Sequence, residues 1–311
     1  MAIAPSQTGI DPQALFAIRD LEMRARVVVE GLRSGLHRSP MEGFSVEFTE
    51  YRQYSLGDDL RYLDWHALAR TDREYIKKFE DETNLRCHIL LDTSRSMLFG
   101  SLPYTKSEYA RTLAATLAYF LLHQRDVVGL SLFDSRIRDY MPSKWGPGHL
   151  HQLLAKLERK PEGRRPTNLG NALEEVAKLN RKRSLILILS DFLTPPEKWG
   201  VELGHLVAMS HDVRAVQILD PAEQSLEFGK AAQWEDLETG NRLYIDPSVA
   251  RLDYLEKFKS HQVAVKQSLE ERGVWLQTVS TDQPLDFVLL EMIQQSGVAR
   301  NMARTNPRES G

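Results

Sequence analysis

Beyond residue 84 the chain alternates short apolar runs with longer stretches that have helical spacing. The apolar runs are seven or eight residues long and fall at 85–91, 126–133, 184–190, 212–219 and 274–280. A run that is apolar throughout, such as SLILILS at 184–190, is typical of a parallel strand covered on both faces. The pattern therefore predicts an α/β fold, a doubly wound and mostly parallel sheet, over residues 85–297.

Helical spacing fills the gaps between these runs. At 107–123, four apolar residues fall on one face of a helix: Ala110, Leu113, Leu117 and Leu121. Further helices are expected at about 148–159 and 168–180, before Ser210, before Gly273, and from Pro284 to about Gly297. A short strand near 137–141 is expected at the edge of the sheet.

The chain before residue 85 has a different pattern. Asp11 can cap, and Pro12 can begin, a helix that runs toward Gly35. From there to residue 84, frequent Gly, Pro and Asp predict loops and short strands, with an edge strand at 75–80. We therefore divide the chain into an N-terminal region of one helix and irregular structure, 1–84, and an α/β domain, 85–297.

Three other segments stand apart from this pattern. Residues 221–247 are polar and contain the turn ETGN, which predicts a hairpin-like insertion. The polar segment 298–311 is expected to be a disordered tail. The stretch GDDLRYLDW, 57–65, mixes acidic, basic and aromatic residues. It predicts a salt-bridge network that holds the irregular region on the α/β domain, in preference to a catalytic site.

Composition narrows the class of protein. Of 311 residues, 42% are hydrophobic and 27% are charged, as in ordinary globular chains. The 40 basic and 43 acidic side chains leave a net charge of -3, so we expect no nucleic acid as partner. The longest apolar stretch, 112–122, is about half of what a membrane-spanning helix needs, and no membrane insertion is expected. The first ten residues lack a secretory signal and Cys87 is the single cysteine, so we expect a cytoplasmic protein.

Polar side chains gather just after the predicted strands. Asp92, Ser94 and Ser96 follow the strand that ends at Leu91, and Asp191 follows the strand that ends at Ser190. Thr167 lies in the loop that enters a helix. The carboxyl ends of parallel strands meet at one edge of the sheet, where such folds bind ligands. These residues are therefore the candidate site.

Two carboxylates and three hydroxyls make a site of oxygen atoms alone, which suits a hard cation such as Mg²⁺, with Mn²⁺ or Ca²⁺ as alternatives. In an extended or turning segment, residues two and four apart point the same way, so Asp92, Ser94 and Ser96 can face one ion. Neutral hydroxyls leave the charge of the ion poorly neutralised. We therefore expect it to attract a further Asp or Glu from a protein partner.

Other interpretations of the same residues exist. Ser94 or Ser96 could cap the next helix, and Thr167 could cap the helix after it. Asp92 could instead be the nucleophile of a Mg²⁺-dependent phosphohydrolase, although Ser94 stands where haloacid-dehalogenase-like phosphatases carry a second aspartate. The chain has no GxxxxGK, GxGxxG or GxSxG motif. Cys87 and His88, at the start of a buried strand, are expected to be packing residues.

The three polar clusters, DTSRS, PTNLGNAL and SDF, resemble the metal-ion-dependent adhesion site (MIDAS) of von Willebrand factor A domains. The upstream stretch that begins SGLHRSPMEGFSVEF and ends KKFEDETNL resembles the signature of a bacterial family, domain of unknown function 58 (DUF58). This resemblance covers nearly the whole chain from about residue 30. It implies a von Willebrand factor A-like sheet of the Rossmann type.

The resemblance also implies roles for the site residues. Ser94, Ser96 and Thr167 would bind the metal directly, and Asp92 and Asp191 would hold its water ligands. Phe192 stands where the family site usually has a glycine. Proteins of this family resemble companions of MoxR-type AAA+ ATPases. The function expected is thus that of a non-enzymatic, metal-dependent protein-interaction module, an adaptor or chaperone-like factor.

Overall fold

The structure is a computed structural model that describes residues 9–38, 50–53, 75–78, 85–159, 167–226, 232–235, 242–245 and 247–295. Contacts divide the chain into two units. One comprises Met1–Gly35 and Leu85–Gly311, and the other comprises Leu36–Asn84. Among the described residues, no helix has the length and apolarity needed to cross a membrane.

A six-stranded sheet forms the centre of the first unit. Its strands are β3 (Arg86–Asp92), β4 (Val127–Phe133), β5 (Ile137–Lys144), β6 (Leu185–Ser190), β7 (Asp212–Leu219) and β10 (Trp275–Ser280). They lie in the order β10-β7-β6-β3-β4-β5. All neighbours are parallel except the edge strand β5, which is antiparallel to β4. The predicted fold class, a doubly wound and mostly parallel sheet, is confirmed.

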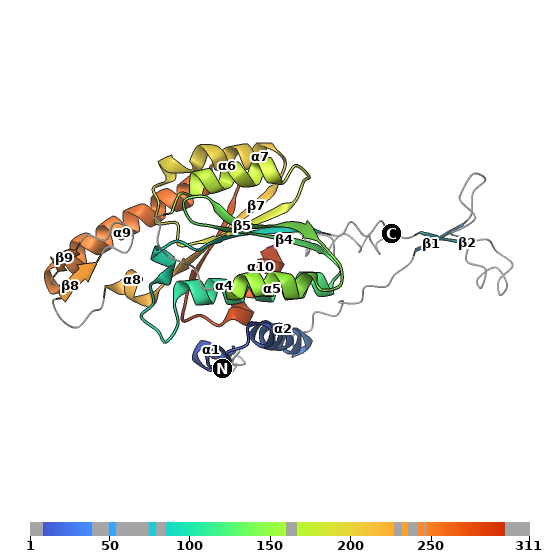
Figure 1. Ribbon diagram of the computed structural model, residues 1–311, viewed down its shortest axis with the longest axis horizontal. Helices are drawn as coiled ribbons and strands as arrows, with labels where there is room; N and C mark the ends of the chain where they lie inside the picture. The colour runs from blue at the N-terminus through green and yellow to red at the C-terminus, as the bar shows by residue number, and fades with distance from the viewer. Residues whose placement is uncertain are drawn as a thin grey trace, which may run out of the picture. The chain divides into compact units, whose positions relative to one another are not determined.

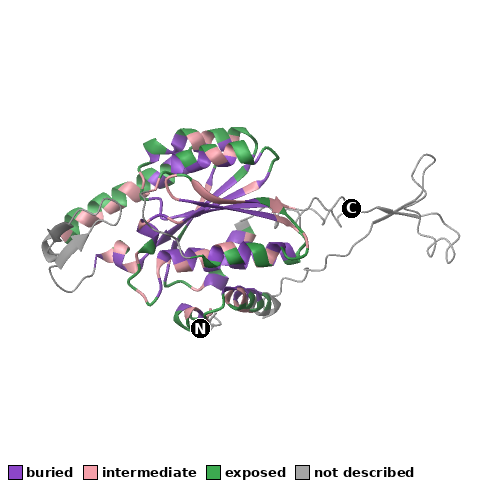
Figure 2. Ribbon diagram, in the orientation of Figure 1, coloured by how far each residue is buried: buried purple, intermediate pink, exposed green. Residues whose placement is uncertain are grey.

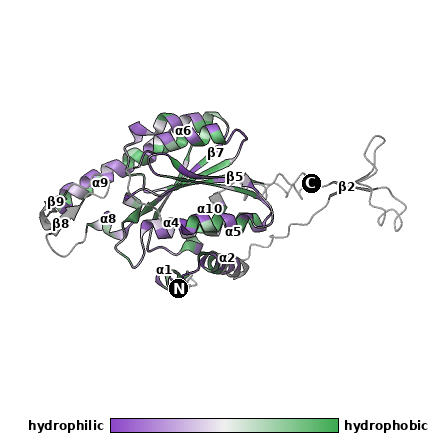
Figure 3. Ribbon diagram, viewed as in Figure 1, coloured by the Kyte–Doolittle hydropathy of each residue, from purple (hydrophilic) through white to green (hydrophobic). Residues whose placement is uncertain are grey.

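Helices cover both faces of this sheet (Figure 1). One face carries α6 (Leu169–Leu179) and α7 (Gly200–Ala208), and the other carries α4 (Lys106–His123), α5 (His149–Glu158) and α10 (Leu285–Gln295). The inner strands are buried almost throughout, as Figure 2 shows. The apolar residues are concentrated in these strands and polar residues lie on the outer surface of the helices (Figure 3). This is the arrangement that continuous apolar runs require.

The N-terminal segment forms two helices where one was predicted. Asp11 caps α1 (Pro12–Ala17) as expected, by accepting the N–H of Gln13 at 3.0 Å. The helix then stops, and α2 (Leu21–Arg38) begins after Asp20, whose side chain accepts the N–H of Met23 at 2.7 Å. A side chain that accepts a nearby backbone N–H takes the place of the bond that a continuous helix would make there. It therefore ends one helix and caps the next.

The apolar side of α2 places these helices in the same unit as the sheet. Five residues with helical spacing are buried there: Leu21, Ala25, Val28, Val29 and Leu32. Arg24 also donates a hydrogen bond to the Thr112 hydroxyl of α4 at 3.0 Å. The N-terminal helices are thus grouped with the α/β domain, whereas the sequence had placed them with the rest of 1–84.

The second unit contains an antiparallel pair, β1 (Glu50–Gln53) and β2 (Tyr75–Lys78). The strand expected at 75–80 is therefore present over most of its length. The stretch 57–65 and the tail 298–311 lie outside the described residues.

The predicted insertion at 221–247 begins with a short helix, α8 (Pro221–Ser225), and contains the hairpin of β8 (Ala232–Glu235) and β9 (Arg242–Ile245). It leads into α9 (Pro247–Glu270). Val265 and Leu269 at the end of α9 are buried in the core. Leu252 has the helical spacing of these core residues, but it is 82% exposed.

Candidate metal site at the carboxyl edge of the sheet

The candidate residues follow the carboxyl ends of two neighbouring strands. Asp92 is the last residue of β3, and Ser190, followed by Asp191, is the last residue of β6. These strands pair directly, with Leu91 opposite Leu189. From β3 the chain adds β4 and β5 on one side and then returns to add β6 on the other. The site therefore lies at the switch point of the sheet, where doubly wound folds bind ligands.

Asp92 is completely buried, and both of its carboxylate oxygens accept hydrogen bonds. Oδ1 accepts the backbone N–H of Ser94 at 2.9 Å, and Oδ2 accepts the Ser190 hydroxyl at 2.6 Å. Burial, and then the negative charge of Asp191, raise the pKa of Asp92 to about 7, although the hydrogen bonds from Ser190 and Ser94 oppose the rise. Within the described ranges, no Lys, Arg or His forms an ion pair with this carboxylate.

Ser94 and Ser96 turn back toward the same point. Their hydroxyl oxygens lie 3.1 Å apart, and both side chains are buried. The chain can turn here because Asp92 holds the Ser94 N–H and a short 3₁₀ helix, η2 (Ser96–Leu98), begins at Ser96. The structure thus brings the oxygens of Asp92, Ser94 and Ser96 together, as their spacing predicted.

Asp191 is also buried, but its carboxylate is paired with a cation. Oδ2 accepts the Lys106 ammonium at 2.9 Å, and the same ammonium donates to Oε1 of Glu223 on α8 at 2.6 Å. Burial alone would lower the pKa of Lys106, but the charges of Asp191 and Glu223 outweigh it, so the pKa lies above its usual value. The second carboxylate of the site is therefore already neutralised by a residue of the chain.

Sequence reasoning missed both Lys106 and Glu223. Lys106 is the first residue of α4, directly after the cap at Thr105. A cation is unfavourable at a helix N-terminus, where the macrodipole is positive. A lysine at this position was therefore a usable signal that acidic residues from elsewhere in the chain bind it.

Thr167 reaches the same edge from the side of β4. It precedes Asn168, whose N–H donates to the carbonyl of Asp134, directly after β4, at 3.0 Å. The cap of α6 is Asn168, which accepts the N–H of Asn171 at 3.1 Å, so the interpretation of Thr167 as the cap is wrong. Thr167 is half-buried. Among the described residues, no three His, Cys, Asp or Glu side chains form a metal-binding cluster.

Phe192 stands in the conformation that a glycine would favour. Its φ is 52°, in the left-handed region, and its ring is buried against Trp199 in an edge contact at 5.8 Å. Its N–H donates to the Ser190 hydroxyl at 3.1 Å, and its carbonyl lies 2.8 Å from Nε2 of His261. The loop after β6 thus keeps a glycine-like shape without the glycine.

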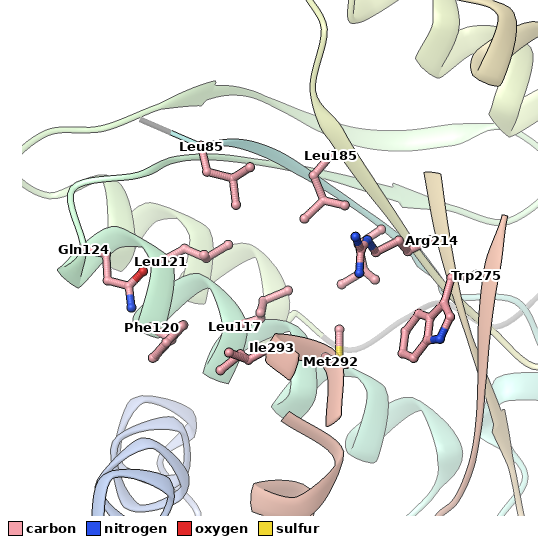
Figure 4. Close-up of a pocket in the computed structure, with 11 residues that line it drawn as sticks. Leu85, Leu117, Phe120, Leu121, Gln124, Leu185, Arg214, Trp275, Met292 and Ile293 are labelled. Atoms are coloured by element: carbon pink, nitrogen blue, oxygen red, sulfur yellow. The ribbon is translucent and has the colours of Figure 1, made fainter. Parts of the chain in front are cut away.

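The opposite end of the sheet holds an apolar pocket of about 40 Å³ (Figure 4). Leu85, Leu185 and Trp275 line it near the amino ends of their strands, together with residues of α4 and α10. Arg214 enters the pocket and pairs with Asp212 at 3.0 Å. None of the predicted ligands lines this pocket.

Comparison with known proteins places the chain in a family. Residues 50–264 match the model of a family described as protein of unknown function DUF58. The chain belongs to the DUF58 family. The DUF58 chain is 28% identical over 278 residues to the uncharacterized protein Mb1516 of Mycobacterium bovis, a match that covers 88% of the chain and 86% of that protein. The family expected from the upstream signature is thus confirmed.

Two solved structures are similar to the DUF58 chain at low identity. BatB of Bacteroides thetaiotaomicron, described as a conserved hypothetical protein, is 15% identical with a TM-score of 0.44, covering 71% of this chain and 100% of that chain. The VWA domain of SpRpn10 is 12% identical with a TM-score of 0.40, covering 67% of this chain and 94% of that chain.

Proposed function

We propose that this DUF58 protein is a non-enzymatic, metal-dependent protein-interaction module. The observation that carries the proposal is the cluster of Asp92, Ser94 and Ser96, in which a buried carboxylate lies beside two buried hydroxyls 3.1 Å apart. Burying a carboxylate without a cation costs free energy, which a bound cation would recover.

The residues present fit a hard divalent cation. Ser94, Ser96 and Thr167 would bind it directly, and Asp92 and Asp191 would orient the hydroxyls and hold coordinated water. Mg²⁺ suits such a set of oxygen donors best, and Mn²⁺ or Ca²⁺ could replace it. The ion would supply positive charge at the carboxyl edge of the sheet.

The partner protein would bind this ion through a carboxylate. Ser94, Ser96 and Thr167 are neutral ligands, so the ion would keep a strong attraction for an Asp or Glu of another protein. The resemblance to companions of MoxR-type AAA+ ATPases makes such an ATPase the partner that we propose, with the complex acting in the cytoplasm.

The geometry of Asp92 favours this function over phosphohydrolysis. A nucleophilic aspartate needs a carboxylate oxygen that can approach the phosphorus atom of the substrate. Both Asp92 oxygens are instead occupied by Ser94 and Ser190, and the residue is fully buried. Asp92 is better placed to hold Ser94 in position than to attack a substrate.

The test is a capture experiment from cell extract, with Mg²⁺ or with a chelator. Three baits are compared: the wild type, the Asp92→Ala, Ser94→Ala double variant, and Ser225→Ala as a control on the surface of α8. We expect an AAA+ ATPase to be retained by the wild type and by the control, in Mg²⁺ alone. Equal retention in all conditions would contradict the proposal. Phosphomonoester turnover that disappears in Asp92→Asn would favour the hydrolase instead.

A further inference from the structure

A completely buried ammonium group joins the candidate site to the insertion. The side chain of Lys106 has no exposed surface, and those of its partners Asp191 and Glu223 are 2% and 16% exposed. Asp191 belongs to the site, whereas Glu223 belongs to α8. One positive charge is therefore shared by two carboxylates from different parts of the fold.

The helices α8 and α9 contact each other. Asp220, the cap of α8, accepts the Ser101 N–H at 2.8 Å, and Oε2 of Glu223 accepts the Asp220 N–H at 3.0 Å. The Tyr254 hydroxyl of α9 donates to the carbonyl of Glu223 at 2.8 Å. Nε2 of His261, also on α9, lies 2.8 Å from the carbonyl of Phe192, the residue after Asp191. Around these contacts, residues 250–264 of α9 are half-buried or exposed. Polar contacts such as these two contribute more to the position of a segment with little burial than to that of a buried one.

We propose that Lys106 couples ion binding at the site to the position of α8 and α9. This inference rests on the proposed metal site. A divalent cation beside Asp191 would repel the Lys106 ammonium and compete with it for the same carboxylate. Ion binding would then weaken the Lys106–Asp191 pair and strengthen the Lys106–Glu223 pair. Lys106 is thus a positioning residue: when the ion is bound, its stronger pair with Glu223 stabilises α8 in the observed position.

The coupling predicts changes of opposite sign in the Mg²⁺ affinity of two variants. Lys106→Met removes the competing charge, so Mg²⁺ should bind more tightly. Glu223→Gln leaves Asp191 as the one acidic partner of Lys106 among the described residues, so the pair should tighten and Mg²⁺ should bind more weakly. By reciprocity, Mg²⁺ should slow hydrogen exchange in α8, and Glu223→Gln should abolish that slowing. A purely structural role for Lys106 would instead weaken binding in both variants.

The experiment is calorimetric titration of the full chain with MgCl₂, combined with hydrogen exchange of residues 222–226. We expect about a fivefold or larger change in Mg²⁺ affinity for each variant, upward for Lys106→Met and downward for Glu223→Gln. Lys257→Met and Asp253→Asn are matched controls, because they alter an exposed ion pair of 2.8 Å on α9. Neither control should change the affinity.

Glu223→Gln keeps the test valid if Lys106→Met does not fold, because the glutamine oxygen can still accept the Lys106 hydrogen bond, at the loss of the bond from the Asp220 N–H that Oε2 of Glu223 accepts at 3.0 Å. Circular dichroism shows whether each variant is folded. If the wild type binds Mg²⁺ and Glu223→Gln binds it equally or more tightly, the coupling is wrong and the metal site stands. If the wild type does not bind Mg²⁺, the metal site and the coupling are both wrong.

Discussion

The hydroxyl of Ser190 donates a hydrogen bond of 2.6 Å to the carboxylate of Asp92 and so joins the last residues of two neighbouring parallel strands. The same oxygen accepts the N–H of Phe192 at 3.1 Å. Ser190 therefore fixes the buried carboxylate at the end of β3 and the loop that follows β6.

Ser190→Ala should destabilise the protein by about 1.5–3 kcal/mol, because it removes a hydrogen bond to a buried charged group and leaves the Phe192 N–H without its acceptor. Urea unfolding measures the loss. Ser225→Ala is the control, since the Ser225 hydroxyl bonds the Pro221 carbonyl at the half-exposed surface of α8. It should cost less than about 0.5 kcal/mol. Equal losses would show that Ser190 does not support the carboxylate.

At Phe192, the glycine variant should be at least as stable as the alanine variant, which is unusual for a buried residue. Replacement by alanine removes a buried ring and should cost about 3–5 kcal/mol. Replacement by glycine removes the same ring but relieves the left-handed backbone, so Phe192→Gly should be as stable as Phe192→Ala or up to about 1 kcal/mol more stable.

Phe133 provides the comparison for Phe192. It is also completely buried, but it lies in strand β4 and its φ is not positive. There the glycine variant should be less stable than the alanine variant by about 0.5–1 kcal/mol. The same order at both positions, measured by urea unfolding, would refute the argument from the backbone of Phe192.

The strands could be predicted from the sequence, whereas the boundaries of the helices depended on tertiary detail. Runs such as SLILILS are apolar throughout, and stretches with helical spacing separate them. Both patterns predict the same alternation of strands and helices. The break between α1 and α2 instead depends on the Asp20 side chain, which binds the N–H of Met23. Leu252 has the spacing of a core residue, but spacing does not reveal whether another surface exists to cover it.

The site was predictable where its residues are close in sequence. Asp92, Ser94 and Ser96 converge because the turn between them is local, and Asp191 follows a strand that could be recognised. Lys106 and Glu223 are separated by 117 residues, and no local pattern pairs them. Their ion pair exists because α4 and α8 both begin at the same edge of the sheet.

If the proposed ion binds, it should stabilise the wild type by about 2.7 kcal/mol when its concentration is 100 times the Kd. Asp92→Asn should lose this response. Without the ion, the same variant should be as stable as the wild type or about 1 kcal/mol more stable, because it removes a buried charge that no cation of the described residues pairs with. Unfolding in Mg²⁺ and in chelator measures both quantities. A metal-free Asp92→Asn protein that is strongly destabilised would contradict this account of the site.

His88 should make stability fall in mild acid. It is completely buried in β3, its Nε2 lies 2.8 Å from the Ser131 hydroxyl, and Gly129 on β4 leaves room for the ring. Burial, and then the charge of His211, lower the pKa of His88 from 6.5 to about 4. Between pH 6.5 and pH 4, His88 binds a proton in the unfolded chain but stays neutral in the folded protein. The contribution of His88 to stability is therefore complete above pH 6.5 and is lost progressively down to pH 4, by about 3 kcal/mol in all.

Comparison with His88→Gln isolates this effect, because glutamine does not titrate and can still bond Ser131. Between pH 7.5 and pH 5 the wild type should lose about 2 kcal/mol more free energy of unfolding than His88→Gln. His151→Gln, on the exposed side of α5, is the control and should follow the wild type. Parallel pH profiles for the wild type and His88→Gln would show that the folded protein accommodates a charged His88.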